Sequence, residues 1–421
     1  MTITLSIISV YLTWIYVFFK KKNYLHVITF ITWGIFFPLA LYQLNWSNLI
    51  ETANNGVFSY LIVTIAIISI VFTFSTLDLR PKKISLNEKI RITRFGKNSF
   101  LFLNLLFVSL YLLENYMGSG SLIPGLVGID IHNKYSAPLI SYITNSSFLF
   151  VSFDYLCYKA TKRKYYLLWM ILIISIPVIT RSSRMVMVIS IVQLLCLYAL
   201  FEKEKRQMIK KEKKQSRRRN LAIAVVIIAT AIFLMAFTNY RMSHYGIYDI
   251  TYQQITGWSG PSWLTWMAPF YGYFALSFNN LKINIMRRHI THNYLGIYSF
   301  ASFYFGLLQI DNIFGIPGSG QTKGNYITNG AANVPTGFWD FYYDYGVFFF
   351  IPFIIALLIL LYFLKRASKN NRLQFKVLYC WYVTYFAFMS FQNTLFMSTS
   401  LIGAFLIYFV IKRSFTVIKI D

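Results

Sequence analysis

The stretch VFSYLIVTIAIISIVFTFSTL, residues 57–77, decides the fold class. It contains no charged residue, and it is long enough to cross a bilayer, whose core of about 30 Å takes about 20 mainly apolar residues in a helix. Backbone groups in lipid must form hydrogen bonds within the protein, and so long and continuous a run is too apolar for a barrel strand. The stretch therefore predicts a transmembrane helix.

Similar apolar stretches recur from Thr2 to Ile411 in a chain that is 57% hydrophobic and 13% charged. They predict an all-α polytopic membrane protein, residues 1–421 forming one integral membrane domain, with about eleven transmembrane helices (a range of 10–13). The first stretch has no cationic region or cleavage site, so we expect it to be retained. The expected spans are 2–19, 25–44, 57–77, 98–116, 136–158, 164–180, 183–201, 220–238, 344–364, 374–394 and 397–411.

The basic residues predict the orientation of these spans. Of the 40 Lys and Arg residues, all but eight fall on one side, which includes the basic loop 202–219. Cytoplasmic loops carry an excess of Lys and Arg, so we expect this side to be cytoplasmic, with the N-terminus outside and the C-terminus inside. The exceptions are Lys134, Arg181, Arg184, Arg241, Lys282, Arg287, Arg288 and Lys323.

The net charge of +26 could also indicate nucleic-acid binding. However, the run Glu202–Arg219 mixes both signs and lacks the interleaved aromatic residues on which bases stack. We interpret the charge as a retention signal that contacts anionic membrane lipids, and we expect no nucleic-acid partner. The three cysteines Cys157, Cys196 and Cys380 lie inside spans without a metal-like spacing, and we predict no metal and no cofactor.

One extracytoplasmic loop, residues 239–343, is far longer than the others, and loops of this length are usually functional. Its aromatic stretches Trp258–Phe278 and Tyr294–Leu308 are expected to lie at the membrane interface. In the alternative topology, residues 261–278 and 294–308 both cross the membrane. The basic run Lys282–Arg288 then lies in the cytoplasm, which still agrees with the excess of Lys and Arg expected there. The stretch Gly315–Gly337 is rich in turn-forming and hydrogen-bonding residues that suit a sugar ligand.

Three arginines are candidates for binding an anionic ligand on the outer side. Arg181 and Arg184 lie in a tight hairpin between two apolar spans, and Arg241 follows a third. A guanidinium near lipid is costly and usually has an anionic partner or a function, and its planar fork suits phosphate oxygens. Snorkelling to lipid head groups is the alternative role for the hairpin pair.

The densest cluster of outer charge is Arg287, Arg288, His289 and His292. Histidine accepts a proton near neutral pH, so His289 or His292 is a candidate general base. Their spacing of three also fits a metal pair, but the sequence offers no convincing third ligand. An amphipathic basic segment at the membrane surface is the alternative.

Asp340 and Asp344 lie four residues apart at the outer edge of a predicted span. We expect them to pair with Arg181, Arg184 or Arg241, although their spacing would also suit an acid–base pair. Glu114 and Asp154 are lone acids in or beside spans.

Two motifs resemble a known family. The stretch Asn325-Tyr-Ile-Thr328, followed by Thr336-Gly-Phe-Trp-Asp-Phe-Tyr-Tyr-Asp344-Tyr-Gly346 before a late span, resembles the hallmark of the oligosaccharide repeat-unit polymerases, the O-antigen and capsule polymerases of bacteria. The Ser-Ser-Arg184 hairpin is similar to their Ser-Arg element. One departure is that Val347-Phe-Phe-Phe350 stands where a second Gly often follows.

This resemblance implies a GT-C-like architecture in the bacterial inner membrane. It also implies a glycosyltransferase that moves a growing glycan from polyprenyl diphosphate onto an incoming lipid-linked repeat unit at the outer leaflet. A chain-length regulator protein is an implied partner. In this interpretation His289, His292 and Arg241 are catalytic, and the residues that bind the diphosphate or glycan are Arg181, Arg184, Arg287, Arg288, Asn325, Thr336, Tyr343 and Asp344.

Other functions share parts of this pattern. A polysaccharide ligase would use the same lipid-linked donor and layout, and only the Asp-Tyr-Gly signature favours the polymerase. A flippase or exporter of lipid-linked glycans predicts charges inside the bundle, internal repeats and short loops, the opposite of this distribution. A membrane O-acyltransferase would need His or Arg near the inner face of early spans, where this chain has only Lys and Arg runs.

Overall fold

The computed structural model describes residues 2–83, 88–124, 140, 143–181, 184–201, 252–287, 296–300, 304, 336–369, 372–391, 396 and 398–419. These residues are mostly helical, as the all-α prediction requires. The basic loop 202–219, the expected span 220–238 and much of the loop 239–343 lie outside the described residues. Predictions about them stay predictions.

Within the described part of the chain, four helices are long and apolar enough to cross a membrane. The prediction of a membrane protein is therefore supported at this level, while the count of eleven spans stays a prediction. Three shorter apolar helices, Val27–Gln43, Tyr165–Thr180 and Val186–Phe201, coincide with further expected spans. The four long helices are Thr2–Lys20, Gly56–Ser75, Arg94–Ser119 and Phe350–Lys369.

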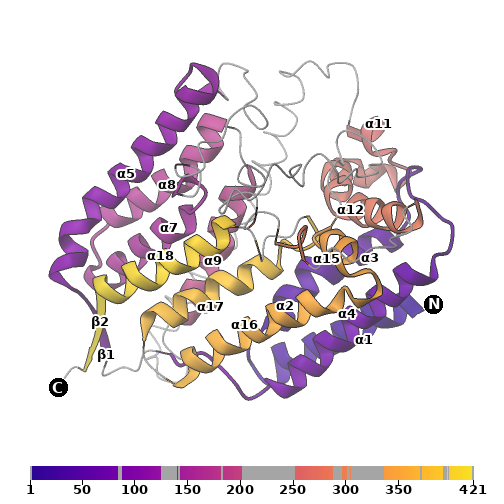
Figure 1. Ribbon diagram of the computed structural model, residues 1–421, viewed down its shortest axis with the longest axis horizontal. Helices are drawn as coiled ribbons and strands as arrows, with labels where there is room; N and C mark the ends of the chain where they lie inside the picture. Colours follow the sequence, from indigo (N-terminus) through magenta and orange to yellow (C-terminus); the bar gives the residue numbers. More distant parts are fainter. Residues whose placement is uncertain are drawn as a thin grey trace.

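The helices form two groups that share α17, Leu373–Phe386 (Figure 1). The first group contains α5 (Arg94–Ser119), α7 (Ser147–Thr161), α8 (Tyr165–Arg181), α9 (Arg184–Phe201) and α18 (Ser398–Ser414). The second contains α1 (Thr2–Ile15), η1 (Tyr16–Lys20), α2 (Val27–Ile31), η2 (Thr32–Phe36), α3 (Phe37–Gln43), α4 (Gly56–Ser75) and α16 (Phe350–Lys369). All 14 residues of α17 are buried, because both groups pack against it.

Close backbone contact explains two of the glycines in this packing. A Cβ on Gly34 of η2 would lie 2.4 Å from the Cα of Ala387, which follows α17. A Cβ on Gly96 of α5 would lie 2.6 Å from the carbonyl oxygen of Ser414 in α18. No real Cβ approaches backbone so closely, so glycine lets these helices meet.

Contacts between chain segments gather basic residues at one end of the molecule. We call this the basic end, and its described residues are 20–22, 78–83, 88–97, 365–369 and 412–419. The Arg80 guanidinium donates to the carbonyl of Lys21, and Lys21 forms an ion pair with Asp78. The backbone N–H of Lys82 donates to the carbonyl of Ala367. Segments that the sequence assigned to one side of the membrane therefore do lie together.

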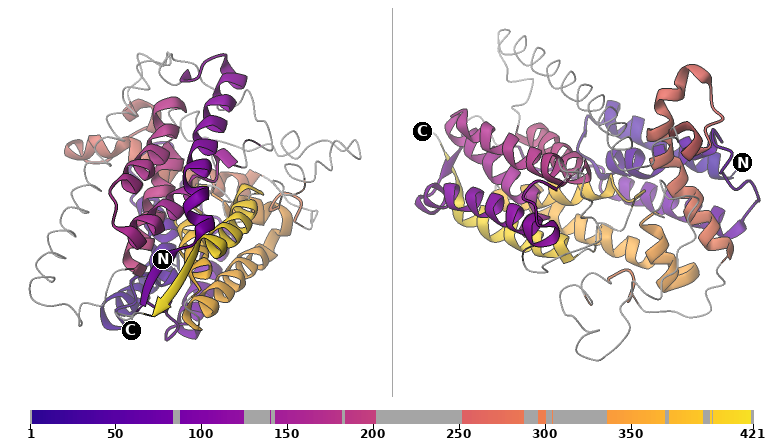
Figure 2. Two further views of the ribbon diagram at one scale, coloured as in Figure 1. Left: turned by 90° about the vertical axis from the view of Figure 1, so that its left-hand side faces the viewer. Right: turned by 90° about the horizontal axis from the view of Figure 1, so that it is seen from above.

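A two-stranded antiparallel sheet at the basic end was not expected from the sequence. Strand β1 (Glu88–Ile92) pairs with β2 (Phe415–Lys419), and Ile90 lies opposite Val417. The pair lies beside the C-terminus in Figure 1 and in the left view of Figure 2. Its inward side chains Ile90 and Ile92 are buried, so this pairing anchors the C-terminal segment to the loop before α5.

The opposite end, which we call the loop end, comprises residues 44–55, 252–287, 296–300 and 336–349. Here lie α11 (Tyr252–Thr256), the 3-10 helix η5 (Ser262–Met267), α12 (Ala268–Arg287), α15 (Phe338–Tyr345) and the 3-10 helix η7 (Gly346–Phe348). In Figure 1, α11 and α12 lie across the molecule from the β1–β2 pair. Helix α16 runs between the two ends, because it follows residues 336–349 and finishes at residues 365–369.

Two expected span boundaries need correction. The span predicted at 344–364 begins instead at Phe350, because Gly346 breaks the helix and leaves Asp344 in the separate helix α15. Within the span predicted at 136–158, α7 begins at Ser147 and residues 140, 143 and 144 are also helical, so the start of that span stays a prediction. The span predicted at 374–394 ends as a helix at Phe386, where turns begin. Apolar composition continues past each helix end, so hydropathy alone misplaced these limits.

Candidate functional site

The candidate site is built around α15, whose sequence FWDFYYDY carries part of the motif that suggested a family. Its aromatic side chains hold the helix in place: Phe338, Trp339 and Phe341 have 0% exposure. The ring of Phe341 lies 5.9 Å from that of Phe396, and the backbone N–H of Gly337 donates to the carbonyl of Met389. The chain after α17 therefore supports α15 on one side.

Asp344 fastens a distant segment of the loop end to α15. Its carboxylate has 0% exposure and accepts the backbone N–H of Tyr298 at 2.9 Å through Oδ1 and that of Ser299 through Oδ2. The Ser299 hydroxyl donates to the backbone carbonyl of Asp340 at 3.3 Å. Hydrogen bonds to an ionised acceptor are about twice as strong as neutral ones, so residues 296–300 are held firmly against α15. We call this set of contacts the Asp344 clamp.

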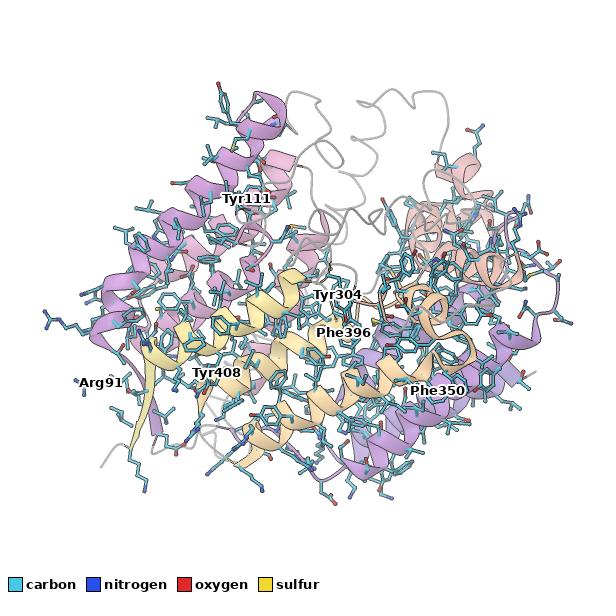
Figure 3. All side chains as sticks on the ribbon, viewed as in Figure 1. Arg91, Tyr111, Tyr304, Phe350, Phe396 and Tyr408 are labelled. Carbon is cyan, nitrogen blue, oxygen red and sulfur yellow. The ribbon has the colours of Figure 1, made fainter. Side chains whose placement is uncertain are left out.

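Aromatic rings extend the clamp. Tyr343 packs edge-on against Tyr298 with ring centroids 4.6 Å apart, and it also contacts Trp339 at 5.3 Å. Phe300 packs against Phe396 at 4.7 Å. Figure 3 labels Tyr304 and Phe396 near the centre of the molecule, between the two helix groups. The clamp therefore lies at the junction of the groups.

Two glycines shape the clamp. Gly346 ends α15 with φ 55° and ψ −125°, a conformation that side-chain-bearing residues rarely adopt. Gly296 has φ 95°, and a Cβ there would lie 2.8 Å from the Tyr345 hydroxyl. The Asp-Tyr-Gly motif at 344–346 is thus a unit: the Asp binds the backbone of 298–299, the Tyr lies against Gly296, and the Gly turns the chain into η7 and α16.

A second assembly docks α11 and α12 onto the segment after α3. The Tyr271 hydroxyl accepts the backbone N–H of Trp46 at 2.8 Å. Asn279 accepts the N–H of Glu51 at 2.8 Å and donates to the carbonyl of Leu49 at 2.9 Å. Lys282 Nζ donates to the carbonyl of Glu51 at 2.7 Å; burial lowers the pKa of Lys282, and the Glu51 carboxylate partly opposes this shift. The described part of the long loop is therefore an ordered cap on the bundle.

The sequence stretch 261–278 that was interpreted as interfacial divides into η5 and the first half of α12. Neither is among the candidate membrane spans in the described residues. Helix η5 buries none of its side chains, and Trp263 and Trp266 are 75% and 56% exposed. By contrast, α12 buries Tyr271, Ala275 and Phe278 against the protein.

The structure brings together only some of the predicted site residues. Thr336, Tyr343 and Asp344 lie in or just before α15; Thr336 is buried, and its carbonyl accepts the N–H of Trp339. Arg287 is the exposed last residue of α12, which contacts α15.

Other predicted residues can be placed only by their position in the chain. Arg181 ends α8 and Arg184 begins α9. The remaining predicted residues lie outside the described part of the chain: Arg241, Arg288, His289, His292 and Asn325.

Sequence reasoning did not foresee two partners of Asp344, the backbone N–H groups of residues 298 and 299. Its expected pairing with Arg181, Arg184 or Arg241 stays a prediction. Every residue except proline has a backbone N–H, so the sequence does not show which residues donate to Asp344. The one indication in the sequence was Gly296, which lies two residues before Tyr298. Direct contact of Asp344 with a substrate stays a prediction.

Glu114 is a second buried acid and lies near the C-terminal end of α5. Thr144 donates its hydroxyl to Glu114 Oε2 at 2.7 Å, and Glu114 is 3% exposed. Among the described residues, no group of His, Cys, Asp and Glu could hold a metal ion. Comparison with protein-family models, with curated proteins and with solved structures gave no match.

Proposed function

We propose that the protein is a membrane glycosyltransferase that polymerises oligosaccharide repeat units carried on polyprenyl diphosphate. In this proposal the basic end faces the cytoplasm of a bacterium and the loop end faces outward from the inner membrane. The growing glycan leaves its lipid carrier at the loop end and is joined to the non-reducing end of an incoming lipid-linked unit.

The observation that carries the proposal is the Asp344 clamp. The residues that resemble the polymerase signature run from Thr336 to Gly346. They do not form the first turns of the apolar helix α16 but include a separate helix, α15. They form a buried unit that fixes residues 296–300 of the long loop against α15. An ordered element that is joined in sequence to a long polar loop is suited to holding a sugar substrate.

The arginines have a defined role in this proposal. The leaving group is a diphosphate, on which negative charge develops as the glycosidic bond breaks. Guanidinium groups at the ends of helices, Arg181 on α8 and Arg184 on α9, would bind its oxygens and stabilise that charge. Arg241, Arg287 and Arg288 would extend the same positive surface. No metal ion is needed for this electrostatic role.

The acceptor needs a base. His289 or His292 would take the proton of the attacking sugar hydroxyl, since imidazole titrates near neutral pH. Asn325, Thr336 and Tyr343 would contribute to glycan binding. A nucleotide sugar is not available outside the cell, so a lipid-linked donor fits chemistry at the loop end. A chain-length regulator would be a partner in the membrane.

The test replaces Arg184 and compares it with an arginine at the basic end. In cells that lack the wild-type gene, Arg184→Ala should abolish long glycan chains while single lipid-linked units accumulate. Arg91→Ala, on the exposed face of β1, should restore normal chains. Chain length is measured on gels of extracted glycan, and membrane levels of both variants are measured by immunoblot.

The same gels discriminate the alternatives. Long chains that remain on the lipid carrier in the deletion strain would indicate a ligase. Single units confined to the cytoplasmic leaflet would indicate a flippase. Normal chains in Arg184→Ala at wild-type protein level would remove Arg184 from the mechanism.

A further inference from the structure

A buried acid–amide pair joins α5 to α7, away from the loop end. Asp154 of α7 and Asn104 of α5 both have 0% exposure. The Asn104 Nδ2 group uses both of its hydrogens: it donates to the Phe100 carbonyl at 3.0 Å and to Asp154 Oδ1 at 3.0 Å. The pair lies among aromatic rings, with Phe153 stacked on Phe100 at 6.3 Å.

Two oxygens of this pair have no hydrogen-bond partner. They are Oδ2 of Asp154 and Oδ1 of Asn104, and both are shielded from solvent. An unpaired buried acceptor destabilises the folded protein, and an unpaired buried charge does so more strongly. Both oxygens can only accept while Asp154 is ionised, so they cannot satisfy each other in that state.

No cation compensates an ionised Asp154 within the described residues. The ion pair found there, Lys21–Asp78, lies elsewhere. Cys157, a thiol one turn further along α7, interacts with Asp154 and carries no positive charge. The basic side chains on β1, α5 and α18, which pack against α7, are exposed: Lys89, Arg91, Arg94, Lys97, Lys412 and Arg413.

We propose that Asp154 is a proton-binding site inside the helix bundle. Oδ2 of Asp154 carries the proton and donates it to Oδ1 of Asn104. The proton makes Oδ2 of Asp154 a hydrogen-bond donor, and Oδ1 of Asn104 then has a donor to accept from. Acid and amide are then joined by two hydrogen bonds, and no net charge is buried.

A metal ion does not fit these oxygens as well. Hard cations such as Ca²⁺ take six to eight oxygen ligands, whereas two oxygens are unpaired here, and the described residues hold no metal-binding cluster. Acidic residues within membrane segments usually mark functional or proton-carrying positions. A neutral acid–amide pair accounts for the buried position of Asp154 and does not depend on the proposed glycosyl transfer.

Infrared difference spectroscopy of the purified protein at about pH 7 tests the proposal. Subtracting the spectrum of Asp154→Asn from that of the wild type should reveal the carbonyl stretch of a protonated carboxylic acid. Asp78→Asn removes an exposed acid, and its difference spectrum should show only carboxylate bands. In Asn104→Leu the acid band should shift upward, because its hydrogen bond to Asn104 is lost.

Thermal unfolding in detergent provides a second measurement. Asp154→Asn should unfold within a few degrees of the wild type, because two amides also form a pair with two hydrogen bonds. Asn104→Leu should unfold at a clearly lower temperature. A carboxylate band in place of the acid band for Asp154, with Asp154→Asn much less stable than the wild type, would overturn the proposal.

Discussion

At the scale of single residues, Asp344 is a buried acid that accepts hydrogen bonds from the backbone of a distant segment. Two N–H donors from residues 298 and 299 approach its two oxygens in a site with no solvent exposure. Asp344→Asn replaces one acceptor oxygen with an NH₂ group that faces another donor. We expect a loss of about 1–3 kcal/mol in unfolding free energy, measured by thermal unfolding in detergent.

The matched control for this substitution is Asp78→Asn at the basic end. Asp78 pairs with Lys21 at 3.6 Å, but its side chain is 89% exposed, and such surface pairs contribute little. Little change in unfolding temperature is expected. Equal behaviour of the two variants would show that the clamp does not contribute to stability.

His26 provides a residue-scale prediction about pH. It lies in the turn between η1 and α2, where Nδ1 accepts the N–H of Ile28 and Nε2 lies 3.0 Å from the Thr76 hydroxyl oxygen. Burial lowers the pKa of His26 to about 4. The unfolded chain therefore binds a proton below about pH 6.5 that the folded protein does not, and stability falls as the pH falls.

The expected loss at about pH 5 is about 2 kcal/mol relative to neutral pH, from this one group. His26→Asn keeps a side chain that caps helix N-termini well and does not titrate. The difference in unfolding temperature between about pH 7 and about pH 5 should therefore be smaller in His26→Asn than in the wild type. Identical pH profiles would contradict a buried neutral imidazole.

At the scale of elements, Gly346 separates α15 from α16. Its φ of 55° with ψ of −125° strains any residue that carries a Cβ. Gly346→Ala should cost about 1–3 kcal/mol of stability, measured by thermal unfolding. In Gly56→Ala, the first position of α4, a Cβ would meet nothing within 4 Å, so no loss is expected there. Destabilisation of both variants alike would argue against this account.

Elements also show what the sequence could and could not predict. Residues 57–77 were predicted as a helix, and Gly56–Ser75 is one, because twenty apolar residues leave few alternatives. Strands β1 and β2 were missed, because Glu88–Ile92 and Phe415–Lys419 are short segments at the edges of basic runs. Their pairing joins positions more than three hundred residues apart, and no local pattern encodes such a partner.

The candidate site was predictable to a similar degree. The stretch Thr336–Gly346 was singled out by its residue types, and the structure shows that its members form a unit. The segment 296–300 was expected only as part of the interfacial stretch Tyr294–Leu308 and not as a partner of Asp344, because Asp344 binds its backbone N–H groups. The hydrogen bonds of Asn279 and Lys282 to the segment after α3 were missed for the same reason.

At the scale of the whole molecule, the two ends differ in charge and in construction. The basic end joins short segments around Lys21, Arg80 and β1, while the loop end joins the segment after α3 to α11 and α12. If α16 spans the membrane between them, these ends must lie on opposite faces, with the basic end in the cytoplasm. Single cysteines introduced at exposed positions test this directly.

Ala53→Cys reports on the loop end and Lys83→Cys on the basic end, since both positions are exposed. The native cysteines Cys157, Cys196 and Cys380 are buried, so the unmodified protein should give little background. A membrane-impermeant maleimide added to intact cells should label Ala53→Cys, whereas Lys83→Cys should react only after the membrane is permeabilised. Labelling in the reverse order would place the Asp344 clamp in the cytoplasm, where a lipid-linked glycan at the outer leaflet could not reach it.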